Sequence, residues 1–265
     1  MNVTRSVLAA WLLAVVIPAQ AGGAKPSANR VEYDKLVAEW TAATKANQEA
    51  MKVLMASDAY KQAVEAKDTA KINELRGTVV RPDAKAFGKR ALALADQFAG
   101  EEAMPFLVYA GSNFADADTA KGVAERVLKD HIKSPALGDL MENAMTLTRF
   151  VGPETSAQLL DRVVAESPHK LPKAWAMYWQ AVTIQRNKEA SAEDKAKAEQ
   201  LLVDAEALAA GTGLAERLAA PRFEKEKLQI GMEVPDIVGE DVDGVAFKLS
   251  DYRGKVVVLD YWGFW

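Results

Sequence analysis

The sequence predicts a mainly α-helical protein with a small α/β segment near its C-terminal end. Two observations support this fold class. Between residues 31 and 210 apolar side chains recur at the spacing of amphipathic helices, with short turn-forming stretches between them. After Pro221 the pattern changes to short β-prone runs on either side of the turn dipeptide Asp243-Gly244.

The composition is that of an ordinary globular protein. Of the 265 residues, 49% are hydrophobic and 26% are charged, which excludes disorder of the whole chain. The formal net charge is −4 and no basic tract is present, so we expect no nucleic-acid partner. The sequence contains no cysteine, which excludes disulfides, thiolate metal sites and a cysteine nucleophile within these residues.

The first residues have the features of a secretory signal peptide. Arg5 precedes an apolar run over residues 7–17, and Ala19-Gln20-Ala21 forms a small-x-small cleavage site. The run is shorter than the roughly 20 apolar residues that span a bilayer. We therefore expect residues 1–21 to be a signal peptide and residues 22–29 a polar linker. The mature protein would then be periplasmic or extracellular, with no membrane span.

Residues 30–220 predict a series of helices joined by short turns. Glycine follows the second, third and last of them, and Gly152-Pro153 opens the sixth. Ser191 is the expected N-cap of the last helix, and Ser134-Pro135 is a further start signal. The predicted helices are 31–57, 59–76, 83–99, 101–112, 118–132, 153–166, 173–186 and 191–210.

Three segments within this helical region are weakly similar to one another. Residues 95–98, 128–131 and 164–167 each precede a joint, and their starts lie 33 and 36 residues apart. A period near 34 residues resembles that of tetratricopeptide repeats. The resemblance implies helix hairpins that bind a protein partner or form an oligomerisation surface. A helical packing region without a ligand is the alternative.

Residue types that carry chemistry are scarce in the helical region. The two histidines, His131 and His169, have no second ligand at metal-binding spacing, so we expect solvated side chains, no metal site and no cofactor. Trp175, Tyr178 and Trp179 share one helical face, which favours packing in the core.

Residues 228–265 contain the motifs that point to a function. Gly231, Pro235-Asp236 and Asp243-Gly244 are followed by the run Leu249–Lys255 and then by the apolar run Val256–Trp262. The apolar run is typical of a strand that is buried on both faces of a parallel sheet. In this order the motifs resemble the opening of a thioredoxin-like redoxin domain, most closely the exported thiol–disulfide oxidoreductases of the TlpA and ResA type. The resemblance implies a partial α/β thioredoxin-like fragment.

The resemblance also implies an activity. In that family an aromatic-Trp-x-x-Trp run precedes a Cys-x-x-Cys site at the start of a helix, and Tyr261–Trp265 matches the run. We therefore expect a full-length parent that exchanges disulfides of proteins or small molecules, and a 265-residue chain that is inactive as written. A selenocysteine at position 266, whose codon is taken for a stop, is the favoured explanation. A frameshift, a nonsense change or an assembly edge are the others.

Two residues are candidates for the redox site. Asp260 matches the carboxylate that many thioredoxins bury under the resolving cysteine, where a raised pKa would suit a proton relay. An ordinary aspartate at a strand edge is the alternative. Trp265 would flank the missing nucleophile and meet the partner disulfide, and Trp262 would pack beneath the site.

Two other functions are compatible with the sequence. The chain could be a non-enzymatic helical binding or scaffold protein with a degenerate redoxin tail. A peroxidase of the peroxiredoxin type is the less favoured reading, because Trp262-Gly263-Phe264-Trp265 matches the dithiol branch of the family better.

Overall fold

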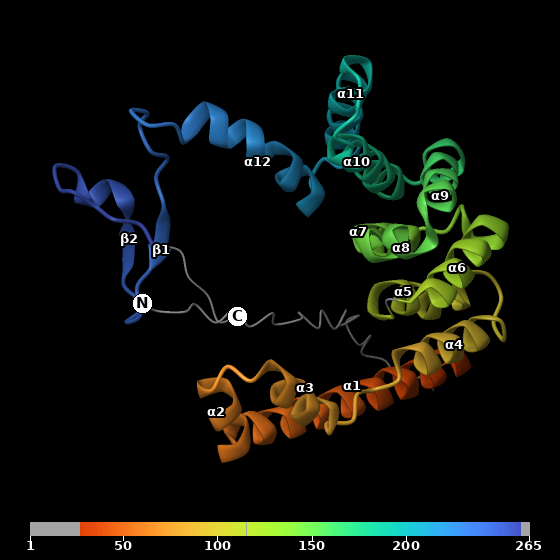
Figure 1. Cartoon of the computed structure of the whole chain (residues 1–265). Coiled ribbons are helices and arrows are strands. Elements are labelled where there is room, and N and C mark those ends of the chain that lie inside the picture. Colours follow the sequence, from red (N-terminus) through yellow and green to blue (C-terminus); the bar gives the residue numbers. More distant parts are fainter. Residues whose placement is uncertain (1–26, 115, 261–265) are drawn as a thin grey trace. The chain divides into compact units, whose positions relative to one another are not determined.

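The computed structural model describes residues 27–114 and 116–260, and these are mainly α-helical, as predicted (Figure 1). The chain divides into a helical unit that ends at Ala219 and a C-terminal unit that begins at Ala220. None of the helices within the described residues is long and apolar enough to cross a membrane. The predicted signal peptide and most of the linker lie outside this part of the chain.

The described residues form twelve α-helices and one two-stranded sheet. The helices are α1 (Ala28–Ala56), α2 (Asp58–Glu65), α3 (Thr69–Gly77), α4 (Ala84–Ala95), α5 (Met104–Asn113), α6 (Ala117–Arg126), α7 (Leu137–Glu142), α8 (Ala144–Val151), α9 (Pro153–Glu166), α10 (Lys170–Arg186), α11 (Ala192–Leu208) and α12 (Gly213–Lys227). The strands are β1 (Val238–Glu240) and β2 (Ala246–Lys248). Short 3-10 helices cover Gly100–Glu102 and Leu249–Tyr252, and a π-helical turn, Val127–His131, follows α6.

The predicted helix over 59–76 is wrong, because two helices occupy this range. Lys67 has a φ of +54°, a left-handed conformation that no α-helix continues through. The Asp68 carboxylate then accepts a hydrogen bond from the Lys71 amide at 2.9 Å and caps α3. The chain therefore stops α2 and starts α3 within a few residues.

Ser134-Pro135 does not start a helix at the predicted position. The Ser134 hydroxyl instead donates to Glu101 Oε2 at 2.7 Å and accepts from the Ala136 amide at 3.1 Å. Helix α7 begins only at Leu137, and α8 follows it directly. This serine therefore fastens the loop before α7 to the segment before α5.

Helix α12 was not predicted, because the glycines at 211 and 213 indicated the end of the helical region. Tertiary packing overrides that local signal. Leu214 is 2% exposed in the core of the helical unit, and the Arg217 guanidinium lies 5.5 Å from the centre of the Trp175 ring. The first turns of α12 are thus held by burial rather than by helix propensity.

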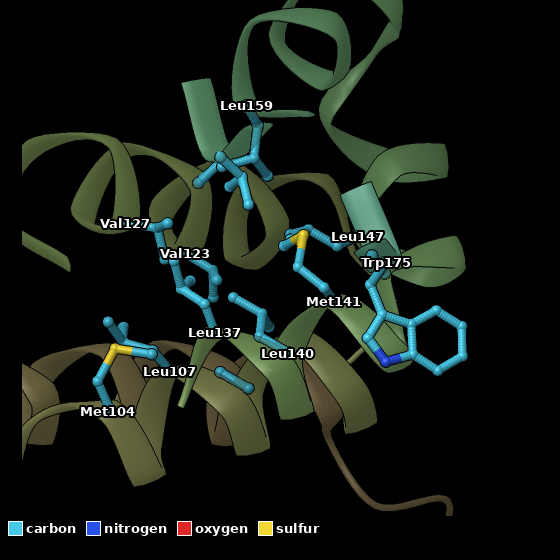
Figure 2. Close-up of a cluster of buried hydrophobic side chains, with 14 of the residues drawn as sticks. Met104, Leu107, Val123, Val127, Leu137, Leu140, Met141, Leu147, Leu159 and Trp175 are labelled. Atoms are coloured by element: carbon cyan, nitrogen blue, oxygen red, sulfur yellow. The ribbon is translucent and has the colours of Figure 1, made fainter. Parts of the chain in front are cut away.

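The core of the helical unit is built around α5. Five of its ten residues are buried, and α5 contacts α4, α6, α7 and α8. Figure 2 shows Met104 and Leu107 of α5 in one cluster with Leu137 and Leu140 of α7. Apolar side chains thus surround α5 almost completely, as expected for a central core helix.

Helix α1 docks on this core through aromatic side chains. The Trp40 ring lies 4.9 Å from the Phe114 ring and 5.1 Å from the Phe87 ring, both in edge-to-face geometry. One face of α1 is thereby fixed to α4 and to the end of α5.

The aromatic face of α10 packs in the core, as predicted. Trp175 and Trp179 are 4% and 7% exposed, and Tyr178 lies edge-to-face against both. The Trp179 indole Nε1 donates to the Met141 carbonyl at 2.6 Å, so its polar group is satisfied where it is buried. This bond joins α10 to α7.

Small residues let α4 and α6 approach closely. A Cβ built on Gly88 of α4 would lie 2.2 Å from Thr119 Oγ1, and one built on Gly122 of α6 would lie 2.5 Å from Leu92 Cδ1. Each glycine faces a side chain of the other helix. The close approach is therefore possible only without a Cβ at either position.

Gly88→Ala should destabilise the helical unit by about 1–3 kcal/mol, because buried Thr119 cannot move out of the way. Gly77→Ala is the matched control, since nothing lies within 4 Å of its Cβ position and alanine gains helix propensity there. Urea unfolding followed by far-UV circular dichroism measures both. Equal stability of the two variants would contradict the close α4–α6 packing.

Candidate functional site

A hairpin opens the part of the C-terminal unit that carries the redoxin-like motifs. Strands β1 and β2 are antiparallel, with Gly239 opposite Phe247. The Asp241 carboxylate accepts hydrogen bonds from the amides of Asp243 and Val245, both at 2.9 Å, and Gly244 has a φ of +78°. The predicted hairpin at Asp243-Gly244 is confirmed, and its turn uses an aspartate and a glycine for distinct physical reasons.

A carboxylate fastens the end of the hairpin to its beginning. Asp236 Oδ1 accepts from the Ser250 amide and Oδ2 accepts from the Ser250 hydroxyl, both at 2.8 Å. The Ser250 amide, and next its hydroxyl, hold the pKa of Asp236 below its ordinary value. Asp236 is therefore ionised at neutral pH and acts as an anchor for the Leu249–Tyr252 turn, not as an acid or base.

The turn directs the following chain into an extended segment. The Lys248 amide donates to Asp251 Oδ2 at 2.9 Å, and Gly254 has a φ of +84° after the turn. An ion pair between Arg253 and Glu233, 2.8 Å long, also spans the unit, but both side chains are largely exposed and the pair adds little stability.

The predicted buried strand at 256–262 does not form over its described part, 256–260. No described residue pairs with this segment through backbone hydrogen bonds, and Val256 and Val258 are 97% and 87% exposed. Val257 and Leu259 are only 41% and 46% exposed. More exposed and less exposed side chains therefore alternate along the segment, as they do in an extended chain. A strand requires a hydrogen-bonded neighbour, and the described residues supply none.

Val257 and Leu259 line an open cavity of about 780 Å³ within the C-terminal unit. Phe223, Val234 and Leu249 add apolar walls, while Lys227 and Lys255 lie at its polar side. Asp236 and Ser250 also line the cavity but are engaged with each other. The described lining is therefore largely apolar, and its two carboxylates, Asp236 and Glu233, are engaged by Ser250 and Arg253.

The structure describes only one of the two predicted site residues. Asp260 is exposed and forms no hydrogen bond or ion pair with another described residue, and Trp265, like Trp262, lies outside the described residues. The proton-relay role of Asp260 stays a prediction. Sequence reasoning noted Asp236 and Ser250 as motif positions but assigned them no role. Their 14-residue spacing across a hairpin was the signal that could have paired them.

The histidines belong to the helical unit. His131 belongs to the π-helical turn and His169 precedes α10, and both are partly exposed. Over residues 27–114 and 116–260, no group of three or more His, Asp or Glu side chains is placed to hold a metal ion.

The comparison with known proteins found one short similarity. The chain is 48% identical over 42 residues to "Thiol-disulfide oxidoreductase ResA" of Bacillus anthracis and, over the same length, to that of Geobacillus kaustophilus (strain HTA426). It is 44% identical over 41 residues to the protein of that name from Bacillus subtilis (strain 168). Each match covers 16% of this chain. No family model and no solved structure matches the chain.

The similarity is local. The chain spans about a quarter of the length of these relatives, 24% of the first two and 23% of the third. The matched length is close to that of segment 228–265, which carries the redoxin-like motifs. A short stretch of this chain is therefore similar to thiol–disulfide oxidoreductases, and the rest of the chain has no such counterpart.

Asp236→Asn should loosen the turn at neutral pH, because an amide cannot replace both acceptor oxygens of the carboxylate. We expect the protection of the Ser250 amide against hydrogen exchange to fall several-fold, as measured by NMR. Asp243→Asn is the control, since only the Asp243 backbone amide takes part in the turn.

The same variant pair gives a pH test. The pKa of Asp236 is lower in the folded state than in the unfolded state, where it is about 3.9. The stabilisation of the turn by the Asp236 carboxylate is therefore fully present above the unfolded-state pKa and is lost as the pH falls through the folded-state pKa. Below the folded-state pKa, the Ser250 amide should therefore be equally protected in the wild type and in Asp236→Asn. A difference in Ser250 protection between the two proteins that persists in strong acid would contradict the role of the Asp236 carboxylate as an anchor.

Proposed function

We propose that residues 228–265 are the opening part of a thioredoxin-like domain, and that the protein is an exported thiol–disulfide oxidoreductase. The observation that carries this proposal is the identity of 44–48% over 41–42 residues to ResA proteins. The motifs of segment 228–265 give the same family, and the segment includes the hairpin, the anchored turn and the apolar extended run.

The proposed reaction needs a sulfur or selenium nucleophile. A thiolate or selenolate at position 266 would attack one sulfur of a partner disulfide, form a mixed disulfide and release the other sulfur as a thiolate. A resolving cysteine three residues later would attack that bond and release the second thiolate. A dithiol reductant would then restore the reduced enzyme. A protein or small-molecule disulfide is the proposed substrate.

Asp260 and Trp265 have proposed roles in this reaction. Asp260 would relay a proton to or from the resolving cysteine once neighbouring strands and helices bury it. Trp265 would flank the nucleophile, which would sit at a helix N-terminus where the dipole favours the anionic form.

A transplant tests the family assignment directly. The 41 matched residues of Bacillus subtilis ResA are replaced by the corresponding residues of this chain, and insulin reduction is measured with dithiothreitol as donor. We expect the chimera to fold and to keep activity within about tenfold of the parent, because interiors tolerate volume-conserving exchange. A control chimera carries residues 170–210, an equally long helical piece. A first chimera as inactive as the control would contradict the proposal.

The 265-residue chain itself should show no disulfide reduction above the blank, because it contains no thiol or selenol. Insulin turbidity in the presence of dithiothreitol measures this. Activity above the blank would show that the chemistry resides elsewhere in the chain.

The DNA after the codon of Trp265 distinguishes the proposed nucleophiles. An in-frame UGA followed by codons for a resolving cysteine and the rest of the domain would support selenocysteine. The same continuation in a shifted frame would support cysteine. Unrelated sequence after this codon would favour a helical binding protein. The helical unit supports this alternative because it has a hydrophobic core of its own.

A further inference from the structure

The helical unit carries a groove of about 980 Å³ formed by α8, α9, α10 and α11. Its apolar wall includes Phe150 of α8, Leu160 of α9, Ile184 of α10 and Leu201 of α11. The groove belongs entirely to residues 145–201, so nothing about it depends on the redoxin-like unit or on the proposed reaction.

Three cationic side chains line this groove: Arg149, Arg186 and Lys197. None of them forms a salt bridge within the described part of the chain. The Arg149 guanidinium lies 5.8 Å from the Phe150 ring centre, and Arg186 Nη2 lies 3.9 Å from Met145 Sδ. Both arginines thus lie against apolar atoms, and both are exposed and without a carboxylate partner in the described residues.

The arginines elsewhere in the same unit include paired and unpaired side chains. Four of them pair with carboxylates: Arg30 with Asp34, Arg90 with Glu39, Arg126 with Asp96 and Arg162 with Glu166. Arg76 and Arg81, which lie outside the groove, form no salt bridge in the described residues, so the groove is set apart by gathering two arginines and a lysine without an acidic partner beside one apolar wall. The one carboxylate among its described lining residues, Asp161, accepts a hydrogen bond from Gln180 Nε2 at 2.6 Å.

A hydroxyl also lines the groove. Ser156 lines the groove on the first turns of α9 and is 8% exposed, yet no hydrogen bond among the described residues uses its hydroxyl. Gly152, which precedes α9, supplies no capping side chain.

We propose that this groove binds a peptide segment in which an acidic side chain is flanked by apolar ones. An arginine fork matches a carboxylate in shape and charge, and the apolar wall would take the flanking side chains. The volume is at the upper end of small-molecule sites and the groove is open, which suits a short peptide better than a small anion.

Fluorescence anisotropy with defined peptides tests the proposal on the full chain. The probes are fluorescein-labelled heptapeptides with a central Glu flanked by Leu, Ile, Phe or Met, and matched peptides with a central Gln. We expect saturable binding of at least one Glu peptide, at least about tenfold tighter than its Gln counterpart and weakened by added salt. Equal affinity for the Glu and Gln peptides, or no saturable binding by any Glu peptide, would overturn the proposal.

Variants assign the binding to the groove. Arg149→Gln with Arg186→Gln should weaken the Glu peptide at least about tenfold. Lys197→Gln, on the exposed face of α11, should weaken it to a smaller extent without any risk to the fold. Arg81→Gln is the matched control, because Arg81 is exposed, lies outside the groove and forms no salt bridge in the described residues.

Thermal melting followed by circular dichroism confirms that each variant is folded. Unchanged peptide affinity in both the double variant and Lys197→Gln would overturn the proposal, as would an equal loss in Arg81→Gln. Because the chain has no thiol, none of these outcomes depends on whether the redoxin assignment holds.

Discussion

The burial of α5 is the constraint on which the helical unit depends. This ten-residue helix has Met104, Phe106 and Leu107 fully buried and is packed against α4, α6, α7 and α8. Gly111 of α5 faces Leu140 of α7 so closely that a Cβ would lie 2.6 Å from its Cδ1. The Trp179–Met141 hydrogen bond holds α10 against α7, and α10 in turn packs against α9 and α11. The groove over α8 to α11 is thus placed by packing that begins at α5.

The C-terminal unit is held together in a different way. None of its described residues is buried, and its order comes from the β1–β2 ladder and the Asp236–Ser250 anchor. Hydrogen bonds between exposed groups add little net stability, so such a unit needs an apolar face to be covered before it becomes stable. The half-exposed Val257 and Leu259 provide one apolar face and the fully exposed Val256 and Val258 the other. The described part of this unit thus combines local order with uncovered apolar surface.

The parts of the fold that the sequence predicted correctly are those that depend on local chemistry. Ser191 caps α11 through the predicted capping geometry, and Pro153 begins α9 as its fixed φ favours. The break at Lys67 and the helix after Gly213 were missed, because one depends on a positive φ and the other on contacts with Trp175. The strand predicted at 256–262 followed from apolar composition, and the partner that such a strand needs is not supplied by the described residues. The Asp236–Ser250 anchor and the cationic groove join residues distant in sequence, which no periodicity reveals.

The chain joins a self-sufficient helical core to a redoxin-like segment whose apolar run has no partner in the described residues. Residue-resolved hydrogen exchange on the whole chain measures both properties in one experiment. We expect protection of at least about 10³-fold for the amides of α5 and almost none for those of Val256–Leu259. Strong protection of Val256–Leu259, or fast exchange throughout α5, would contradict this arrangement.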